Sequence, residues 1–383
     1  MGSKYFDNAA TTRTKEEVIK EMIPYFKTEF GNPSSMYTLG RKSKMAITEA
    51  RKQVAELINA NPNEIIFTSG GSESDNIALK GIAHRYKEKG NHIITSKIEH
   101  HAILNSCKAL ENEGFKVTYL NVDKEGLVDI NELEKSINEN TILISIMTAN
   151  NEIGTIQPIK EISKIAKKHN IIFHTDAVQA CGNIPVDVKE MGVDLLSMSG
   201  HKLYGPKGVG ALYVKAGIEL ENLIDGGSQE KGRRAGTENV PGIVGLGKAC
   251  KIAKQDLNSH IKYLKKLRDY YISEVKRKIP DAVLNGSAQN RLPGNANFSF
   301  KGMEENAILL KLDGVGISAS SGSACSTGNP NASHVLTAIG LDETDAKSAL
   351  RVTFGEDNTI EDIDYLVYNL EKIVEELRKS SEM

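Results

Sequence analysis

The segment Asp194–Gly210 reads DLLSMSGHKLYGPKGVG, an apolar run that leads directly into a lysine and a rigid turn. Leu195–Met198 has the length and the boundaries of a buried strand. Lys202 follows between the end of that strand and the turn Gly205–Gly208, so its side chain is held in place, unlike a lysine on a solvated helix. The segment therefore predicts a fixed lysine at a strand end.

A carboxylate follows a second apolar strand in the same way. Ile171–Phe173 leads into His174, Thr175 and Asp176. A lysine and an aspartate at the ends of neighbouring strands can serve pyridoxal 5'-phosphate (PLP): the lysine forms a Schiff base and the aspartate pairs with the pyridinium nitrogen. A structural ion pair beside a surface turn is the alternative, and the two features together favour the cofactor.

Composition sets the broad class of the protein. The 383 residues can bury a large core, and two domains are the natural expectation. A net charge of −2 argues against nucleic acid as the main partner. The sequence contains no apolar run of about 18 residues, so no membrane span is expected. The N-terminus lacks an apolar signal region and a myristoylation pattern.

The four cysteines are too far apart for a C-x-x-C motif: Cys107, Cys181, Cys250 and Cys325. This spacing argues against a zinc site and against a disulfide scaffold, and it fits a reducing cytoplasm. Cys107, Cys250 and Cys181 are interpreted as packing residues. Cys325 lies among Ser, Gly, Asn and Pro in Ser320–Pro330, which predicts a mobile polar loop with a reactive thiol.

Strands and helices alternate over most of the first 215 residues. This alternation predicts an α/β fold whose mostly parallel, doubly wound sheet is covered on both faces, with ligands at the carboxyl ends of the strands. The expected strands are 64–68, 92–95, 116–122 and 141–147, followed by strands around Ile171, Leu195 and Ala211. The expected helices are 15–26, one ending before Asn61, and 72–89, 102–113, 130–137 and 159–169.

Three polar motifs follow the predicted strands. In Thr68–Asp75, paired glycines permit a tight turn, Ser72 and Asp75 have capping-box spacing, and the helix start suits a phosphate; a plain capped helix is the alternative. In Glu99-His100-His101, a histidine could stack on a planar ring or be purely structural. Asn150–Gly154 could hold a substrate carboxylate or form an ordinary turn.

The C-terminal part has a different pattern of expected helices and strands. A long helix with Leu257, Ile261, Leu264, Tyr271 and Val275 on one stripe is expected to link two domains. The expected elements beyond it are strands 295–300 and 350–354 and helices 306–312, 333–339 and 360–378. We predict a large domain over residues 1–255 and a smaller α+β domain over 256–383, and the N-terminal segment can pack on the smaller one. The glycine-rich segment 226–239 is interpreted as functional or as an interface.

Six ordered motifs resemble the NifS/IscS-type cysteine desulfurases, which are class V aminotransferases of PLP fold-type I. The motifs are Ser199–Gly208, Ser321–Cys325, Asn151–Gly154, Asp176–Gln179, Arg234–Thr237 and the strand with Arg351. The long loop with Ser-Gly-Ser-Ala-Cys is similar to the NifS/IscS branch and not to the short-loop SufS branch. The resemblance implies a homodimer that converts L-cysteine to L-alanine with a persulfide on the enzyme.

The resemblance also implies residue roles. Lys202 is the Schiff-base lysine and proton shuttle, Asp176 holds the pyridinium nitrogen, Gln179 binds the ring hydroxyl oxygen and His100 stacks on the ring. Cys325 attacks the substrate sulfur. The remaining roles are phosphate binding by Gly71, Ser72, Ser199, His201 and the partner subunit's Thr237, and substrate carboxylate binding by Asn151 and Arg351. An unperturbed thiol, with a pKa of about 8.5, is mostly protonated at neutral pH, so we predict that His100 accepts the proton of Cys325.

Two positions depart from the family pattern. Ser72 replaces a frequent threonine and keeps the hydroxyl, whereas Glu356 and Asp357 follow Gly355 where relatives often carry a basic residue. The acceptor of the sulfur is expected to be an iron–sulfur scaffold, with tRNA thiolation and cofactor biosynthesis as alternatives. The alternative functions are a selenocysteine lyase, an aminotransferase and a non-catalytic sulfur-transfer scaffold.

Overall fold

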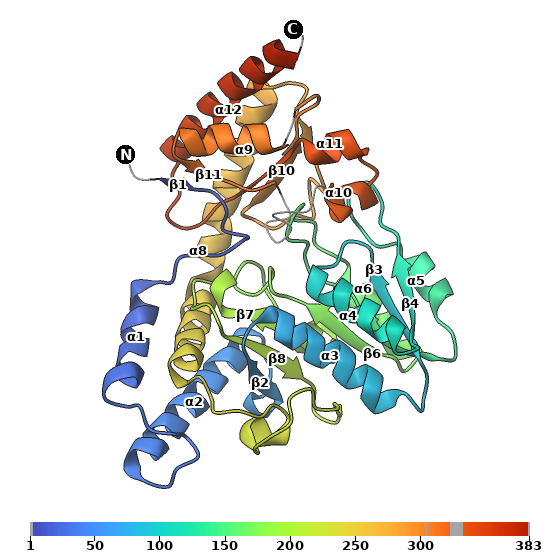
Figure 1. Ribbon diagram of the computed structural model, residues 1–383, viewed down its shortest axis with the longest axis vertical. Coiled ribbons are helices and arrows are strands. Elements are labelled where there is room, and N and C mark those ends of the chain that lie inside the picture. The colour runs from blue at the N-terminus through green and yellow to red at the C-terminus, as the bar shows by residue number, and fades with distance from the viewer. Residues whose placement is uncertain (1–2, 304, 322–331, 382–383) are drawn as a thin grey trace.

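The computed structural model describes residues 3–303, 305–321 and 332–381 of the chain. A larger and a smaller part are joined by one long helix, and the chain begins and ends at the smaller part (Figure 1). No helix within the described residues is both long and apolar enough to cross a membrane.

A seven-stranded sheet forms the centre of the larger part. Its strands are β2 (Ile65–Thr68), β3 (His92–Ser96), β4 (Lys116–Leu120), β5 (Thr141–Ser145), β6 (Ile172–Asp176), β7 (Leu195–Ser199) and β8 (Gly210–Val214). Their spatial order is β2-β8-β7-β6-β5-β3-β4, and among them only β8 runs antiparallel to its neighbours. The predicted mostly parallel sheet is confirmed. The exception arises because β7 and β8 are joined by a short connection without a crossover helix.

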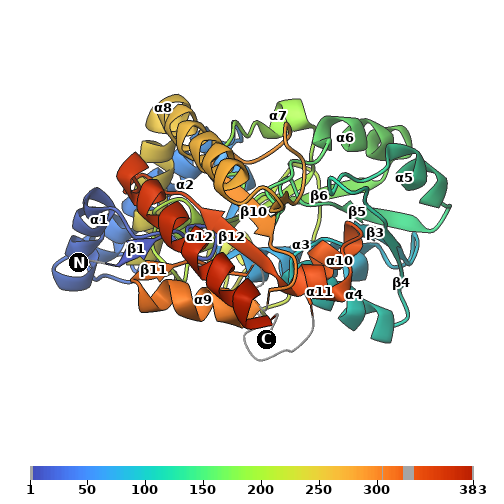
Figure 2. The same cartoon turned by 90° about the horizontal axis from the view of Figure 1, so that it is seen from above.

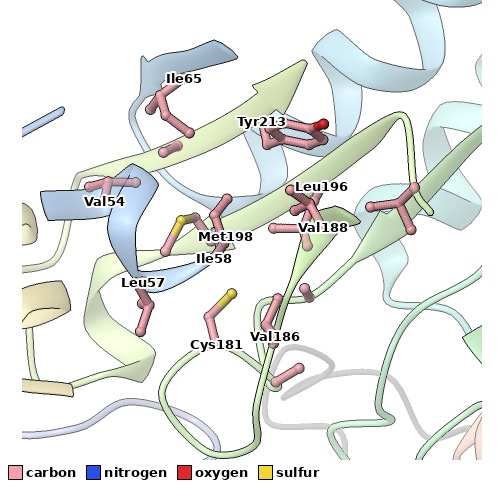
Figure 3. Close-up of a cluster of buried hydrophobic side chains, with 14 of the residues drawn as sticks. Val54, Leu57, Ile58, Ile65, Cys181, Val186, Val188, Leu196, Met198 and Tyr213 are labelled. Carbon is pink, nitrogen blue, oxygen red and sulfur yellow. The ribbon is translucent and has the colours of Figure 1, made fainter. Parts of the chain in front are cut away.

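Helices cover both faces of this sheet, as a doubly wound fold requires. Apolar side chains of α1 (Glu16–Lys27), α2 (Thr38–Leu57), α5 (Ile130–Ser136), α6 (Ile159–Lys168) and α7 (Val188–Met191) join one cluster; those of α3 (Gly71–Tyr86) and α4 (His101–Asn112) join another. Successive strand residues alternate between the two clusters: Leu196 packs in the first and Leu195 in the second. Figure 3 shows part of the first cluster, where Leu196, Met198 and Tyr213 meet Val54 and Ile58 from the α2 region.

The smaller part has its own core. Its strands are β9 (Val283–Leu284), β10 (Asn295–Ser299) and β12 (Ala349–Thr353) in one antiparallel sheet, and β1 (Lys4–Tyr5) paired in parallel with β11 (Ile317–Ser318). Helices α9 (Glu305–Gly314) and α12 (Ile360–Ser381) cover it. Phe6 is fully buried in this core, so the N-terminal segment packs on the smaller part. The sequence pattern did not predict the two-residue strands because they carry no periodicity.

Helix α8 (Val240–Lys278) runs through both parts. Cys250 packs in the core of the larger part, whereas Leu264, Tyr271 and Val275 pack in the core of the smaller one. Viewed from above, α12 lies beside α8, and the two helices contact each other (Figure 2). The boundary at 255/256 stays a prediction; it falls between Cys250 and Leu264.

A fourth apolar cluster joins the two parts. Ile98, Met147 and Ile153 of the larger part pack against residues of α10 (His334–Ala338) and α11 (Glu343–Lys347), including Val335 and Leu336. Residues 333–347 therefore belong to the smaller part in sequence, between β11 and β12, but pack at the seam between the parts.

Candidate active site

A cleft of about 240 Å³ lies between the strand ends of the large sheet and the smaller part. Ten of the twelve predicted site residues line it: Gly71, Ser72, His100, Asn151, Asp176, Gln179, Ser199, His201, Lys202 and Arg351. Thr237 does not line it, and Cys325 lies outside the described residues.

Lys202 sits in the connection between β7 and β8, in a short 3₁₀ turn over Gly200–Lys202. A Cβ atom at Gly200 would lie 2.9 Å from the carbonyl oxygen of Pro206, so the turn tolerates only glycine there. Tyr204 adopts a left-handed φ of 62°, a conformation that is uncommon for non-glycine residues. Nζ of Lys202 donates to the carbonyl oxygens of Ala9 and Ala10 at 2.6 and 2.7 Å. The predicted fixed lysine is confirmed in its position.

Asp176 ends β6 and is 6% exposed. Its Oδ1 accepts a hydrogen bond from the backbone N–H of Val178 at 2.8 Å. Among the described residues, no donor is hydrogen-bonded to its Oδ2. Burial raises the pKa of Asp176, and the Val178 N–H and the charge of Lys202 oppose that rise. A cationic N–H donor entering the cleft would relieve this cost.

The first turn of α3 differs from the predicted capping box. The helix begins at Gly71, its N-cap is Gly70 at φ 156°, and no side chain of the described residues caps it. Asp75 is instead 1% exposed and lines the cleft, and burial together with the charge of Asp176 raises its pKa. The prediction was wrong because position 75 faces the core, so its carboxylate cannot return to the helix start.

The uncapped helix start can receive an anion. A Cβ atom at Gly71 would lie 2.7 Å from Cγ2 of Val178, so the backbone runs close against the floor of the cleft. Ser199 and His201 line the same region. Nδ1 of His201 lies 3.1 Å from Oγ1 of Thr11, and burial and the charge of Lys202 lower the pKa of His201 to about 4. The ring is therefore neutral at physiological pH.

Arg351 provides the cation on the opposite side of the cleft. It lies within β12, and its side chain is 2% exposed. Nη2 contacts Oδ1 of Asp7 at 2.7 Å, and Nη1 donates to the carbonyl oxygen of Asn151 at 3.1 Å. A guanidinium held at two points is oriented for a carboxylate ligand.

Asn150, adjacent to Asn151, is structural. Its Oδ1 accepts from the backbone N–H groups of Glu152 and Ile153, and its Nδ2 donates to the carbonyl oxygen of Ile98. Asn150 thus stabilises the turn Asn150–Gly154, and Asn151 and Glu152 line the cleft.

The structure adds residues to the cleft that sequence reasoning missed: His101, Glu152, His334 and Asp75. His101 begins α4 and His334 begins α10, and their rings lie 4.7 Å apart between centroids. His101 belongs to the motif Glu99-His100-His101 and Glu152 to Asn150–Gly154, but no motif includes His334, and 233 positions separate it from His101 in sequence. Asp75 could have been noticed as a charged residue on the apolar face of a helix.

The other cysteines are packing residues, as predicted. Cys107, Cys181 and Cys250 are buried and reduced. Burial raises the pKa of Cys107 and of Cys181 to about 12, so neither thiol ionises readily.

Acidic residues near Arg351 have cationic partners. Glu356 pairs with Lys15 at 2.7 Å and Asp357 lies 3.7 Å from Arg13. Glu356 and Asp357, which depart from the family pattern, are therefore paired with basic residues of the N-terminal segment.

Comparisons with known proteins agree with this geometry. The family model described as aminotransferase class-V matches residues 4–366. "Cysteine desulfurase IscS" of Clostridium botulinum (strain Hall) is 54% identical over 379 residues, covering 98% of this chain and 96% of that protein. "Cysteine desulfurase IscS" of Dictyoglomus turgidum is 55% identical over 377 residues, with the same coverage. The chain belongs to the cysteine desulfurase family.

Solved structures of similar proteins share the fold. A "NIFS-LIKE PROTEIN" superposes with a TM-score of 0.92 at 39% identity, covering 97% of this chain and 99% of that one. A structure described as "SspA in complex with cysteine" superposes with a TM-score of 0.80 at 40% identity, covering 92% and 99%. The predicted PLP fold-type I architecture is confirmed.

The cofactor of this family is PLP, and the cleft fits it. The uncapped start of α3 suits the phosphate, Oδ2 of Asp176 suits the pyridinium N–H, and Lys202 supplies the amine for covalent attachment. The three groups lie at the carboxyl ends of adjoining strands or in the loops that follow them, where ligands of such sheets bind.

Proposed function

We propose that the protein converts L-cysteine to L-alanine and keeps the sulfur as a persulfide on Cys325. The observation that carries the proposal is the joint position of Lys202, Asp176 and Arg351 around one cleft. A lysine and an aspartate suit a pyridine cofactor, and a buried arginine suits the carboxylate of an amino acid. The names of the relatives support the same reaction.

Each predicted residue then has a defined task. Arg351 and Asn151 bind the substrate carboxylate, Gln179 binds the ring hydroxyl oxygen and His100 stacks on the ring. The backbone at Gly71 and Ser72, with Ser199 and His201, holds the phosphate. Asp176 remains ionised beside the pyridinium N–H, because the cation offsets the cost of burying its charge.

The protons and the sulfur are moved by the chain's own groups. PLP, when bound, supplies the electron sink that makes the α-proton of the amino acid acidic. Lys202, as a neutral amine, removes that proton and returns it. The thiolate of Cys325 attacks the substrate sulfur: the S–S bond forms, and the C–S bond breaks with its electron pair left on the β-carbon. That carbon takes up a proton, and the products are L-alanine and the Cys325 persulfide.

The test is incubation of the PLP-loaded protein with L-cysteine. We expect equal amounts of L-alanine and of persulfide on Cys325, measured by amino-acid analysis and by mass spectrometry of the intact chain. Cys325→Ser should lose both products. If Cys325→Ser loses only the turnover of L-cysteine and keeps the turnover of L-selenocysteine, the protein is a selenocysteine lyase instead.

We also infer that the protein acts as a homodimer. An exposed apolar surface covers α1, the connection to α2 and α2 itself, with Phe26 at 66%, Phe30 at 68% and Met36 at 89% exposure. Surfaces of this kind mark protein interfaces. Thr237 is exposed and does not line its own cleft; it lies on the segment 226–239, which the Arg51–Glu230 ion pair (2.6 Å) anchors beside α2. This position suits a residue that completes the partner's phosphate site.

Mixed subunits test that inference. Lys202→Ala and Thr237→Ala should each be weakly active alone, whereas their hybrid should regain one complete site, because a chain with Lys202 would receive Thr237 from its partner. Sedimentation should show a dimer that Phe26→Glu weakens. Additive activities in the mixture would contradict the shared site.

The acceptor of the sulfur is proposed to be an iron–sulfur scaffold protein in the cytoplasm. The supporting facts are the IscS names of the relatives and three reduced buried cysteines. Transfer of labelled sulfur from the Cys325 persulfide to purified candidate acceptors, including a tRNA thiolation enzyme, distinguishes the expected acceptors.

A further inference from the structure

An ion pair joins the start of α3 to the glycine-rich segment 226–239. Nε of Arg234 donates to Oε1 of Glu73 at 2.8 Å, and Nη2 donates to Oε2 at 3.3 Å. The side chain of Arg234 is 23% exposed and that of Glu73 is 15% exposed. An arginine that is hydrogen-bonded to a carboxylate at two points, and shielded from solvent, is held in one orientation. The contact therefore fixes Arg234 against the first turn of α3.

Glu73 also holds the loop that leads into α3. Its Oε2 accepts a hydrogen bond from the backbone N–H of Ser69 at 2.9 Å. Ser69 directly precedes Gly70, the N-cap of the helix, so this contact restrains the backbone just before the expected phosphate site. Because the carboxylate is turned back toward Ser69, the helix start, which no side chain of the described residues caps, stays open to an anion.

The charge of Arg234 matters to an anion at this turn. Glu73 is adjacent in sequence to Ser72, which is expected to hold the phosphate. Burial raises the pKa of Glu73, but the hydrogen bonds from Arg234 and Ser69 outweigh burial and hold the pKa below its ordinary value. Glu73 is therefore ionised at neutral pH, and without a cation beside it the carboxylate would repel a phosphate group.

The segment that carries Arg234 is fixed at a second point. The side chain of Glu230 is 4% exposed, and its Oε1 lies 2.6 Å from Nη2 of Arg51 in α2. Oε2 of Glu230 accepts from the backbone N–H of Phe67 in β2 at 3.0 Å. Glu230 and Lys231 have left-handed φ values of 48° and 61°, which are uncommon for such residues. The buried carboxylate thus holds an unusual backbone turn in place.

Thr237 lies between fixed residues. Arg234 stands three positions before it, and Asn239 stands two positions after it as the N-cap of α8. Oδ1 of Asn239 accepts from the backbone N–H of Gly242 at 3.1 Å. The inference below rests on the proposed homodimer, in which Thr237 completes the phosphate site of the other chain. The restraint on Arg234 then limits how far Thr237 can move in that site.

We propose that the Glu73–Arg234 ion pair couples the two PLP phosphate sites of the dimer, with Glu73 and Arg234 as positioning residues. Within its own chain, the pair restrains the loop before α3 and neutralises the carboxylate beside the phosphate. Through Arg234, the same pair sets the position of the Thr237 that enters the other chain's site. A change at this one contact therefore alters PLP binding in both chains.

Arg234→Gln tests the pair in the homodimer. The dissociation constant of PLP, measured by fluorescence titration after removal of the cofactor, should rise about 10- to 100-fold, because a part-buried carboxylate loses its hydrogen-bonded cation. Arg85→Gln is the matched control: Arg85 pairs with Glu219 on the exposed side of the same helix, so the constant should stay unchanged. An unchanged constant in Arg234→Gln would overturn the proposal.

The double variant Glu73→Gln with Arg234→Gln separates charge from position. It removes the repulsion of the phosphate but does not restore the restraint on Thr237. Its dissociation constant for PLP should therefore lie between those of the wild type and Arg234→Gln. This variant also keeps the test decisive if the lone Glu73 carboxylate prevents Arg234→Gln from folding. A wild-type constant in the double variant would mean that the pair positions nothing.

Mixed dimers test the effect on the other chain's site. One chain carries Lys202→Ala with Arg234→Gln and the other is wild type, so only the wild-type chain gives the yellow absorption of covalently bound PLP. The dissociation constant read from this absorption should be about 3- to 10-fold higher than with Lys202→Ala alone in the first chain, the size of one weakened hydrogen bond. Equal constants in the two hybrids would overturn the coupling.

The outcomes separate this inference from the proposed homodimer. If the wild type sediments as a monomer, the homodimer and the coupling fail together. If Thr237→Ala in the Lys202→Ala chain raises the constant of the hybrid but Arg234→Gln in that chain does not, the homodimer stands and the coupling alone fails. These measurements are binding constants, so they do not depend on whether the protein converts L-cysteine.

Discussion

The floor of the cleft comes from one sheet, whereas the opposite wall is assembled from segments that are distant in sequence. Asp176 ends one strand and Lys202 follows its parallel neighbour, only 26 positions further along the chain. Arg351 meets Asp7 across 344 positions, and His334 meets Glu99 across 235. The floor can therefore be deduced from local motifs, but the wall depends on how the smaller part packs against the larger one.

The largest effect should come from the floor. Lys202→Ala removes the amine that binds the cofactor covalently and moves the α-proton, so we expect a loss of about 10³-fold or more in kcat. The preparation should also lose its yellow colour, which absorption spectroscopy measures. Lys207→Ala, in the exposed turn of the same connection, should keep both properties. Turnover by Lys202→Ala would show that this amine is not required, and would contradict the role proposed for the floor of the cleft.

An intermediate effect is expected from the wall. Arg351→Lys keeps the charge but loses the planar fork that Asp7 and Asn151 orient, so KM for L-cysteine should rise about 10- to 100-fold, corresponding to about 1.4–2.8 kcal/mol. Steady-state kinetics measure this change. Arg378→Lys, in the surface pair with Asp281, is the control. A change in kcat without a change in KM would mean that Arg351 does not bind the substrate carboxylate.

A smaller effect tests the backbone beneath the floor. A Cβ atom at Gly210 would lie 2.6 Å from the carbonyl oxygen of Met198 and 2.7 Å from Cα of Gly70. Gly210→Ala should therefore displace the start of α3, destabilise the protein by about 1–3 kcal/mol and weaken PLP binding. Thermal unfolding and a PLP titration measure both. Gly314→Ala meets no atom within 4 Å, and it should leave both values unchanged.

The smallest effect concerns stability and pH in the cofactor-free protein. Because folding raises the pKa of Asp176, the folded state binds this proton more tightly than the unfolded state, and stability falls as pH rises from about 4 through the raised pKa. Asp176→Asn lacks this loss. Relative to wild type, the variant should therefore gain free energy of unfolding between pH 4 and pH 8, which urea unfolding at several pH values measures. If the free energies of unfolding of Asp176→Asn and wild type differed by a constant amount across that range, burial of Asp176 would not cost stability when it ionises.

The sequence predicted the elements that carry strong periodicity. The buried strands and the amphipathic helices of the large sheet are where the pattern placed them, to within a few residues. The strand pairing of β8 and the short strands β1, β9 and β11 were not predictable, because tertiary partners and not local propensity determine them.

The site was predictable only in part. Ten residues of the cleft follow from motifs, but the cap of α3 was wrong because Asp75 is turned into the core. His101 and His334 were missed as a pair because their contact exists only once α10 packs at the seam. Local chemistry is visible in a sequence, whereas contacts between distant segments require the folded chain.

Helix α8 has a mechanical consequence for the substrate. Its 39 residues form a continuous rod of roughly 58 Å, at about 1.5 Å per residue, and its only proline stands in the first turn. One half of this rod is fixed in each core, so it sets the separation of the two parts and with it the distance between the amine of Lys202 and the guanidinium of Arg351. The span available to an amino acid is thus preset when the chain folds, before any ligand arrives.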